Sequence, residues 1–164
     1  MKYSVPTATT LFQSPLGWIR LVASEKGLSG VWFEGQHHDT SRWPTSAHHP
    51  VLQQTMRQLT QYFDQQRQHF ELPLDRQAGT SFQQSVWLAL QGIGYGQTCS
   101  YGALSARIGR PMAVRAVGSA VGRNPLCIVV PCHRVLGATG QLTGYAGGLE
   151  RKLALLKIEG KICL

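Results

Sequence analysis

The sequence predicts an α/β protein of the α+β type, with a small antiparallel sheet and one helix ahead of a mainly helical part that contains a helix-turn-helix. Three observations support this class. Strand-like alternation lies in the first 75 residues, helical spacing of apolar residues dominates after residue 80, and the charge balance changes between the two. We therefore expect an N-terminal scaffold domain over residues 1–76 and a C-terminal domain over residues 80–164.

The first part has the pattern of an antiparallel meander over residues 9–33. Residues 18–23 alternate with the strand period, turn sequences flank them, and a third strand is expected over residues 31–33. After a loop over residues 34–50, apolar spacing predicts a helix over residues 51–63. Alternation at Phe70, Leu72 and Leu74 predicts one further strand before a linker at residues 77–79.

The second part begins with Ser81 and Gln84, a capping-box pattern that predicts a helix. Ser100 can cap another helix, which a three-residue turn at residues 109–111 would end. Pro111 suits the first position of a following helix that runs to about Arg123. Together these elements have the layout of a helix-turn-helix.

The helix expected over residues 111–123 has two different faces. Val114, Val117 and Val121 are spaced to face the core. Small residues and one arginine lie on the other side: Arg115, Gly118, Ser119 and Gly122. Such a face allows close approach to a phosphate backbone, and the alternative is a helix tightly packed in the protein interior.

Two more elements complete the prediction. Residues 126–130 are all apolar, which predicts a buried strand leading into Pro131 and Cys132. After a glycine-rich loop over residues 137–148, a last helix is expected to end at Gly160, with four apolar residues on its buried stripe: Leu149, Leu153, Leu156 and Ile158.

The net charge of +8 is unevenly distributed. Residues 76–149 contain six arginines and no acidic residue, whereas residues 1–75 are neutral. This favours a polyanionic partner, although a basic surface without a partner has the same composition. The sequence predicts no membrane span and no secretory signal. We interpret the four cysteines (Cys99, Cys127, Cys132 and Cys163) as reduced thiols of a cytoplasmic protein.

Cys132 is the candidate nucleophile. His133 and Arg134 follow it directly, and a nearby base or positive charge favours the reactive thiolate. In an extended strand, however, neighbouring side chains point to opposite faces, so Cys132 and His133 can meet only if the backbone turns. A strand would also place Cys127 and Cys132 on opposite faces, which argues against a zinc site.

These residues resemble the O6-alkylguanine-DNA alkyltransferase family, whose active-site signature is similar to Pro131–Val135. Further segments resemble the family in order and spacing, and the similarity covers about residues 80–160. They are Phe82–Trp87, Ser100–Gly102, Arg115–Gly118, Gly122–Pro125 and Gly144–Gly148. Residues 1–76 resemble the family's variable N-terminal domain in layout only.

The resemblance implies a stoichiometric DNA repair protein that needs no cofactor. The alkyl group of O6-alkylguanine, and as a second candidate that of O4-alkylthymine, would pass irreversibly to Cys132. By similarity, His133 relays the Cys132 proton through a water toward Glu159. Tyr101 would serve the leaving guanine oxygen, and Asn124 would hold the turn before the active-site segment.

The resemblance also implies how DNA is held. The nucleotide must leave the duplex, because its reactive atom cannot be reached inside the base stack. The helix would enter the minor groove, and Arg115 would fill the gap that the flipped nucleotide leaves in the duplex. The other residues expected to contact DNA are Pro111, Gly118, Ser119, Gly122 and Arg123. The pocket for the base would include Val121, Cys127, Val135, Tyr145, Ala146 and Gly147.

Two positions depart from parts of the family pattern. Ala146 stands where some relatives have serine, and Cys127 where some have a proline lining the base pocket, which puts the range of accepted alkyl groups in doubt. No cysteine occurs in residues 1–98, so we predict no metal, although some relatives bind zinc there. We expect a monomer and leave cooperative assembly on DNA open.

Two other functions compete with repair. One is a module that binds damaged DNA or regulates transcription without chemistry, and Cys132 argues against it. The other is a thiol hydrolase that uses Cys132 and His133 on small esters or amides. A hydrolase would turn over repeatedly, whereas the repair protein should react once per molecule.

The charge distribution makes a first testable prediction. DNA binding should weaken steeply as the salt concentration rises, because arginines that contact phosphates release counterions. The dissociation constant for a short duplex, measured over a series of salt concentrations, checks this. A flat response would contradict phosphate contacts by the arginines.

Overall fold

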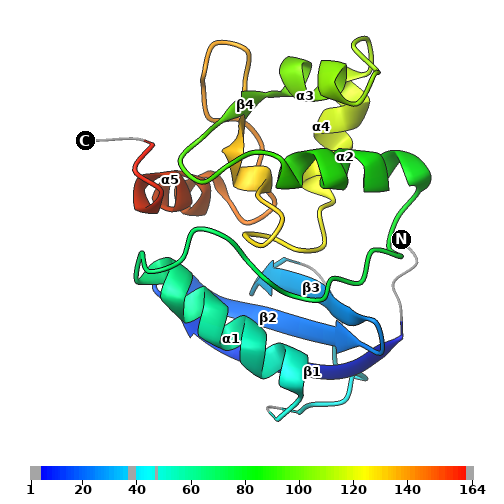
Figure 1. Cartoon of the computed structure of the whole chain (residues 1–164), viewed down its shortest axis with the longest axis vertical. Helices are drawn as coiled ribbons and strands as arrows, with labels where there is room; N and C mark the ends of the chain where they lie inside the picture. Colours follow the sequence, from blue (N-terminus) through cyan, green and yellow to red (C-terminus); the bar gives the residue numbers. More distant parts are fainter. Residues whose placement is uncertain (1–4, 37–39, 47, 162–164) are drawn as a thin grey trace. The chain divides into compact units, whose positions relative to one another are not determined.

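A three-stranded antiparallel sheet with one helix forms the first unit of the chain, Met1–Ala78 (Figure 1). The computed structural model describes residues 5–36, 40–46 and 48–161. The strands β1 (Pro6–Ser14), β2 (Gly17–Ser24) and β3 (Gly27–Phe33) pair in sequence order, which confirms the predicted meander. Part of the loop predicted over residues 34–50 lies outside the described residues, as does Cys163.

The helix α1 (Pro50–Phe63) packs against the sheet. Its Leu52, Leu59 and Tyr62 are fully buried, and Ile19 and Leu21 of β2 belong to the same unit's core. The apolar spacing predicted this helix within one residue. It begins at a proline, which suits the first helical position because that residue needs no N–H partner.

The strand predicted around Phe70, Leu72 and Leu74 is absent from the described residues. Only Leu74 pairs, in an isolated bridge with Leu28. The Gln58 side chain of α1 explains the difference, because it donates to the carbonyl of Glu71 (2.9 Å) and accepts from the N–H of the same residue (2.8 Å). A helix side chain therefore satisfies backbone groups that a neighbouring strand would otherwise bind.

The second unit, Gly79–Leu164, begins with α2 (Ser81–Gln91). Its capping box is formed by Thr80 and Gln83, one residue before the predicted pair Ser81 and Gln84. The backbone N–H of Gln83 donates to the Thr80 hydroxyl, and the Gln83 side chain accepts from the Thr80 N–H. The pattern of a hydroxyl residue followed three residues later by glutamine fits either frame, so sequence alone could not choose.

A helix-turn-helix follows, formed by α3 (Tyr101–Arg107) and α4 (Val114–Gly122). Ser100 caps α3 as predicted, accepting from the N–H of Ala103. However, α4 begins at Val114, and Pro111 lies in the exposed turn before it. The carbonyl of Arg110 explains the longer turn, because it accepts both the Ser105 hydroxyl and the N–H of Ala113.

The predicted faces of α4 are mostly observed. Val117 and Val121 are buried, and the Trp87 indole of α2 donates to the carbonyl of Ala120. Val114 is 39% exposed, so its predicted place in the core is wrong. Helical side chains lean toward the N-terminus, so a residue in the first position extends beyond the start of the helix.

The last elements connect distant parts of this unit. The short strands β4 (Cys99–Ser100) and β5 (Val135–Leu136) pair in parallel. They bring the start of α3 next to the segment that follows Cys132. The helix α5 (Leu149–Ile158) buries the side chains of Lys152, Leu155 and Leu156.

The stripe predicted for α5 was wrong at Leu149, which is 46% exposed, while Leu153 is half-buried. A lysine in mid-helix resembles a solvent-facing residue in the sequence pattern, but Lys152 points inward because backbone carbonyls receive its ammonium. Among the described residues, no helix combines the length and the hydrophobicity needed to cross a bilayer.

Candidate active site

The residues before Cys132 form a tight buried turn instead of the predicted strand. Asn124 fixes this turn, since its amide donates to the Val130 carbonyl (2.7 Å) and its oxygen accepts from the N–H of Leu126 (3.1 Å). Ile128 adopts a left-handed backbone conformation with φ of 71°. This conformation is rare for a β-branched residue, so the turn must hold it in place. A short apolar run does not reveal such a reversal.

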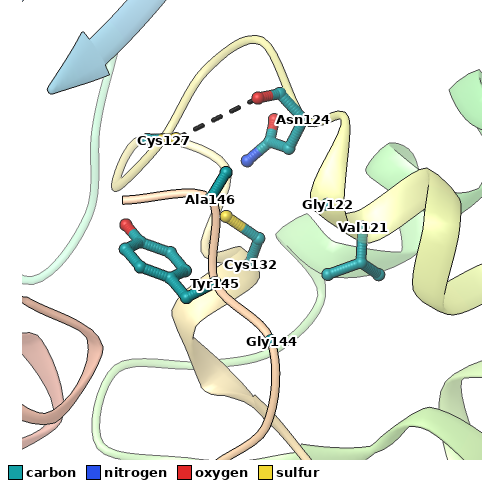
Figure 2. Close-up of a pocket in the computed structure, with 8 residues that line it drawn as sticks. All are labelled: Val121, Gly122, Asn124, Cys127, Cys132, Gly144, Tyr145 and Ala146. Atoms are coloured by element: carbon teal, nitrogen blue, oxygen red, sulfur yellow. Dashed lines mark hydrogen bonds between the residues drawn. The ribbon is translucent and has the colours of Figure 1, made fainter. Parts of the chain in front are cut away.

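The turn places Cys127 and Cys132 in one pocket. They share its lining with residues of α4, the Asn124 turn and the loop after β5 (Figure 2): Val121, Gly122, Asn124, Gly144, Tyr145 and Ala146. The prediction that the two cysteines lie on opposite faces is wrong, because it assumed a strand. Four of the six predicted pocket residues (Val121, Cys127, Tyr145 and Ala146) lie in this lining, while Val135 and Gly147 are buried outside it.

Cys132 begins the 3₁₀ turn η1 (Cys132–Arg134) directly after Pro131. Its side chain is almost fully buried. A hydrogen bond with Cys127 is the main cause that lowers the pKa of the Cys132 thiol. Burial opposes this shift, and a hydrogen bond with Asn124 and the charge of Lys152 add to it. The local structure therefore favours the nucleophilic thiolate.

His133 turns away from the pocket surface toward Glu159. Its Nε2 lies 2.8 Å from Glu159 Oε1, and both side chains are fully buried. A carboxylate only accepts hydrogen bonds, so Nε2 carries the hydrogen and Nδ1 is left with a lone pair. Within the described residues, Nδ1 is a buried atom without a hydrogen-bond partner. Burial lowers the pKa of His133, so the ring is a neutral base.

Arg134 holds Glu159 from the other side. Its Nε and Nη2 donate to Oε2 and Oε1 of Glu159, each at 2.9 Å, in a two-pronged ion pair. Its Nη1 donates to the carbonyl of Ile93, and the ring of Tyr95 lies 6.0 Å from the guanidinium carbon. Burial alone would raise the pKa of Glu159, but the hydrogen bonds and charges of His133 and Arg134 lower it to about 2.

Lys152 is a site residue that the sequence analysis missed. Its fully buried ammonium donates to the carbonyls of Val135 (2.6 Å), Thr143 (2.7 Å) and Gly144 (3.4 Å). It thereby ties the pocket loop to the segment after Cys132. Burial lowers the pKa of Lys152 to about 8, and a negative charge on Cys132 would raise it. In the sequence, the position of Lys152 among the apolar residues of the last helix is the only sign that it belongs to the site.

Tyr101 stands at the start of α3, where β4 brings it to the pocket loop. Its hydroxyl donates to the carbonyl of Gly144 at 3.4 Å. Burial is the main cause that raises the pKa of this phenol, so it stays protonated at neutral pH and can act as a donor. Its ring also faces Gly118 of α4, where a Cβ atom would come within 3.7 Å of it.

The predicted DNA-binding residues lie on one exposed stretch of the helix-turn-helix. Pro111, Arg115, Ser119, Gly122 and Arg123 are exposed, and Gly118 is half-buried. Gly122 also lines the pocket, so this surface and the cavity around Cys132 adjoin at the end of α4. In the described residues, no cluster of three or more histidine, cysteine or acidic side chains is arranged to hold a metal ion.

Comparison with known proteins places this geometry in a family. Residues 81–161 match the model of the 6-O-methylguanine DNA methyltransferase DNA-binding domain, and residues 8–76 match the ribonuclease-like domain of the same proteins. The chain belongs to the 6-O-methylguanine DNA methyltransferase family. This confirms the resemblance seen in the sequence and extends it to the N-terminal part.

Individual relatives agree with this assignment. The methylated-DNA–protein-cysteine methyltransferase of Methanosarcina acetivorans is 46% identical over 92% of this chain and 96% of its own length. The protein of the same name from Haemophilus influenzae is 41% identical over 92% of this chain and 84% of its own length. The crystal structure of Mycobacterium tuberculosis OGT in complex with DNA has a TM-score of 0.86 and 42% identity, covering 93% of this chain and 92% of that one.

The ion pairs of Glu159 make a testable prediction about acid stability. The carboxylate titrates at about 2 in the folded protein and near 4.5 when exposed. A lowered pKa stabilises the fold fully above the unfolded value, and this contribution disappears as the pH falls from about 4.5 to about 2. Chemical unfolding at several pH values should show this loss in the unmodified chain and not in Glu159→Gln.

The matched control is Glu150→Gln on the exposed start of the same helix, which should keep the acid-dependent loss. If the pH profile of Glu159→Gln below 4.5 matched that of the unmodified chain, the predicted role of this carboxylate would be wrong.

Proposed function

We propose that this chain repairs DNA by direct reversal, accepting the alkyl group of O6-alkylguanine on Cys132 in a single irreversible event. The observation that carries the proposal is a buried cysteine in the pocket, favoured as a thiolate, with a neutral histidine base directly after it in the chain. The family membership and the DNA complex of the M. tuberculosis relative support alkyl transfer and a DNA partner.

In the proposed step, the Cys132 sulfur attacks the alkyl carbon on the side opposite guanine O6. A carbon–sulfur bond forms as the carbon–oxygen bond breaks, and its electron pair passes to the guanine. The Cys132 proton goes through a water to His133 Nδ1, because Nε2 already carries the hydrogen held by Glu159. Glu159 remains ionised, since its pKa is about 2, and stabilises the resulting imidazolium.

The charges around the site favour this step. Arg134 and Glu159 balance each other, which leaves the Lys152 ammonium as a positive charge near Cys132. Ionisation of Cys132 neutralises that excess, and such an interaction is strong in a water-poor site. The Tyr101 hydroxyl, at the pocket loop, supplies the hydrogen bond to the leaving guanine oxygen.

DNA is held by the exposed surface of the helix-turn-helix in this proposal. Small residues at Gly118, Ser119 and Gly122 let α4 approach the minor groove closely. Arg115 enters the duplex as the target nucleotide rotates into the pocket, and Arg123 contacts the backbone. We assign the alkyl acceptor and this surface to residues 80–164. Because its substrate is DNA, we also propose that the protein is cytoplasmic, and associated with the nucleoid if the cell is bacterial.

Intact mass spectrometry tests the proposed transfer. After incubation with a duplex that contains one O6-methylguanine, the chain should gain the mass of a single CH₂ group, mapped to Cys132, and the lesion should be lost. Cys132→Ser should gain nothing, while Cys99→Ala, a buried thiol outside the pocket, should react normally.

Two results would contradict the transfer to Cys132. If the chain gains no mass and the lesion in the DNA is unchanged, the result would favour a module that binds damaged DNA without chemistry. Many lesions removed per chain, or repeated cleavage of small esters, would favour the thiol hydrolase.

The role of Arg115 is tested by comparing two substrates. Arg115→Ala should slow repair of duplex DNA roughly five- to thirtyfold, because the gap left by a flipped base would cost about 1–2 kcal/mol more. Reaction with a free O6-alkylguanine base should hardly change. Arg57→Ala, an exposed arginine of α1, removes the same charge and serves as the control. Equal losses of reaction rate on the duplex and on the free base would show that Arg115 does not fill the gap in the duplex.

A further inference from the structure

The pocket contains a second thiol beside the nucleophile. Cys127 and Cys132 are five residues apart, yet the reversal at Ile128 brings both side chains to the same cavity. Their exposed fractions are 1% and 4%. Both thiols line this cavity, and Cys127 is the main influence that lowers the pKa of the Cys132 thiol. A buried thiol commonly serves as a small apolar group, but one that shares a cavity with the reacting sulfur can also influence it.

Cys127 has a second polar neighbour. Its Sγ lies 4.0 Å from the backbone carbonyl oxygen of Asn124, the contact drawn as a dashed line in Figure 2. A thiol carries one hydrogen, so Cys127 can donate either to this carbonyl or to the sulfur of Cys132. The Asn124 contact is at the long limit for sulfur, and it therefore restrains that hydrogen only weakly.

The charge on Cys132 decides between these two acceptors. As a neutral thiol, Cys132 can donate its own hydrogen to Cys127, which leaves the Cys127 hydrogen for the Asn124 carbonyl. As a thiolate, Cys132 can only accept, and hydrogen bonds to an ionised acceptor are about twice as strong as neutral ones. A thioether sulfur accepts only weakly, so alkylation of Cys132 removes this preference again.

We propose that Cys127 is a positioning residue whose S–H turns from the Asn124 carbonyl to the Cys132 sulfur when that sulfur ionises, and turns back after alkyl transfer. No bond to Cys127 forms or breaks, and it keeps its proton throughout. This inference rests on the proposed transfer to Cys132. It gives the cysteine that departs from the proline of some relatives a task that proline, with no donor on its side chain, cannot perform.

Other titratable and charged groups also surround Cys132. Lys152 and Tyr101 interact with its charge, while His133, Arg134 and Glu159 form the network behind it. All of them remain in a Cys127 variant. A difference between the pH profiles of variant and unmodified chain therefore isolates the effect of Cys127.

The test measures the rate at which Cys132 reacts with iodoacetamide over a range of pH, following the mass of the Cys132 peptide. Cys127→Ala should raise the apparent pKa of Cys132 by about one unit and lower the rate at neutral pH about tenfold. The rate at high pH should recover, because the nucleophile itself is intact. Cys127→Ser keeps a donor and should restore most of the neutral-pH rate.

Two further variants keep the test decisive. Cys127→Val supplies volume without a donor, and replaces Cys127→Ala if thermal unfolding shows that the alanine variant does not fold. Cys99→Ser is the matched control, because Cys99 is a buried thiol whose sulfur faces the carbonyl of Ser100. An unchanged pH profile in the donor-free variants, or a serine variant as slow as alanine, would overturn the proposal.

The outcome separates this inference from the proposed function. If the unmodified chain gains a methyl group from DNA and the donor-free variants keep its pH profile, repair stands and the role of Cys127 fails. If no methyl group is gained but the profile shifts, Cys127 still holds the thiolate and the proposed repair fails.

Discussion

A single buried carboxylate, that of Glu159, organises the site. Its two oxygens accept hydrogen bonds from His133 Nε2, from Nε and Nη2 of Arg134 and from the backbone N–H of Gly96. These donors come from two separate parts of the chain, and Arg134 also reaches the carbonyl of Ile93. A buried charge is tolerated only when such partners surround it, so the arrangement of these segments is strongly specified. The orientation of the histidine base follows directly from this constraint.

The distribution of charge connects the site with the surface. Between residues 76 and 149 the chain has arginines and no acids, which suits a surface that approaches phosphates. Because this stretch has no acidic residue, it places no carboxylate near Cys132. Glu159 is the acid that faces the site, and Arg134 neutralises its charge. The basic composition of this domain therefore favours binding of a polyanion at its surface and also the ionised form of Cys132 in its pocket.

Sequence patterns predicted most elements, because alternation and helical spacing report which side of a regular element is buried. They failed where the backbone is irregular. The apolar run before Pro131 fits a strand as well as a buried turn, and nothing in it marks the left-handed conformation of Ile128. The predicted separation of Cys127 from Cys132 failed with it. Lys152 was missed because the carbonyls that bind its ammonium come from residues 8 to 17 positions away.

The left-handed Ile128 also limits how this protein can be stabilised by substitution. Glycine or asparagine would relieve a backbone conformation that costs about 1–3 kcal/mol in a β-branched residue. The Ile128 side chain is 1% exposed, however, and truncating a buried isoleucine costs about 2–5 kcal/mol through lost packing. The packing loss is the larger effect, so the strained isoleucine is the more stable choice. Evolution by single substitutions would therefore retain it, and a designer would have to refill the surrounding core at the same time.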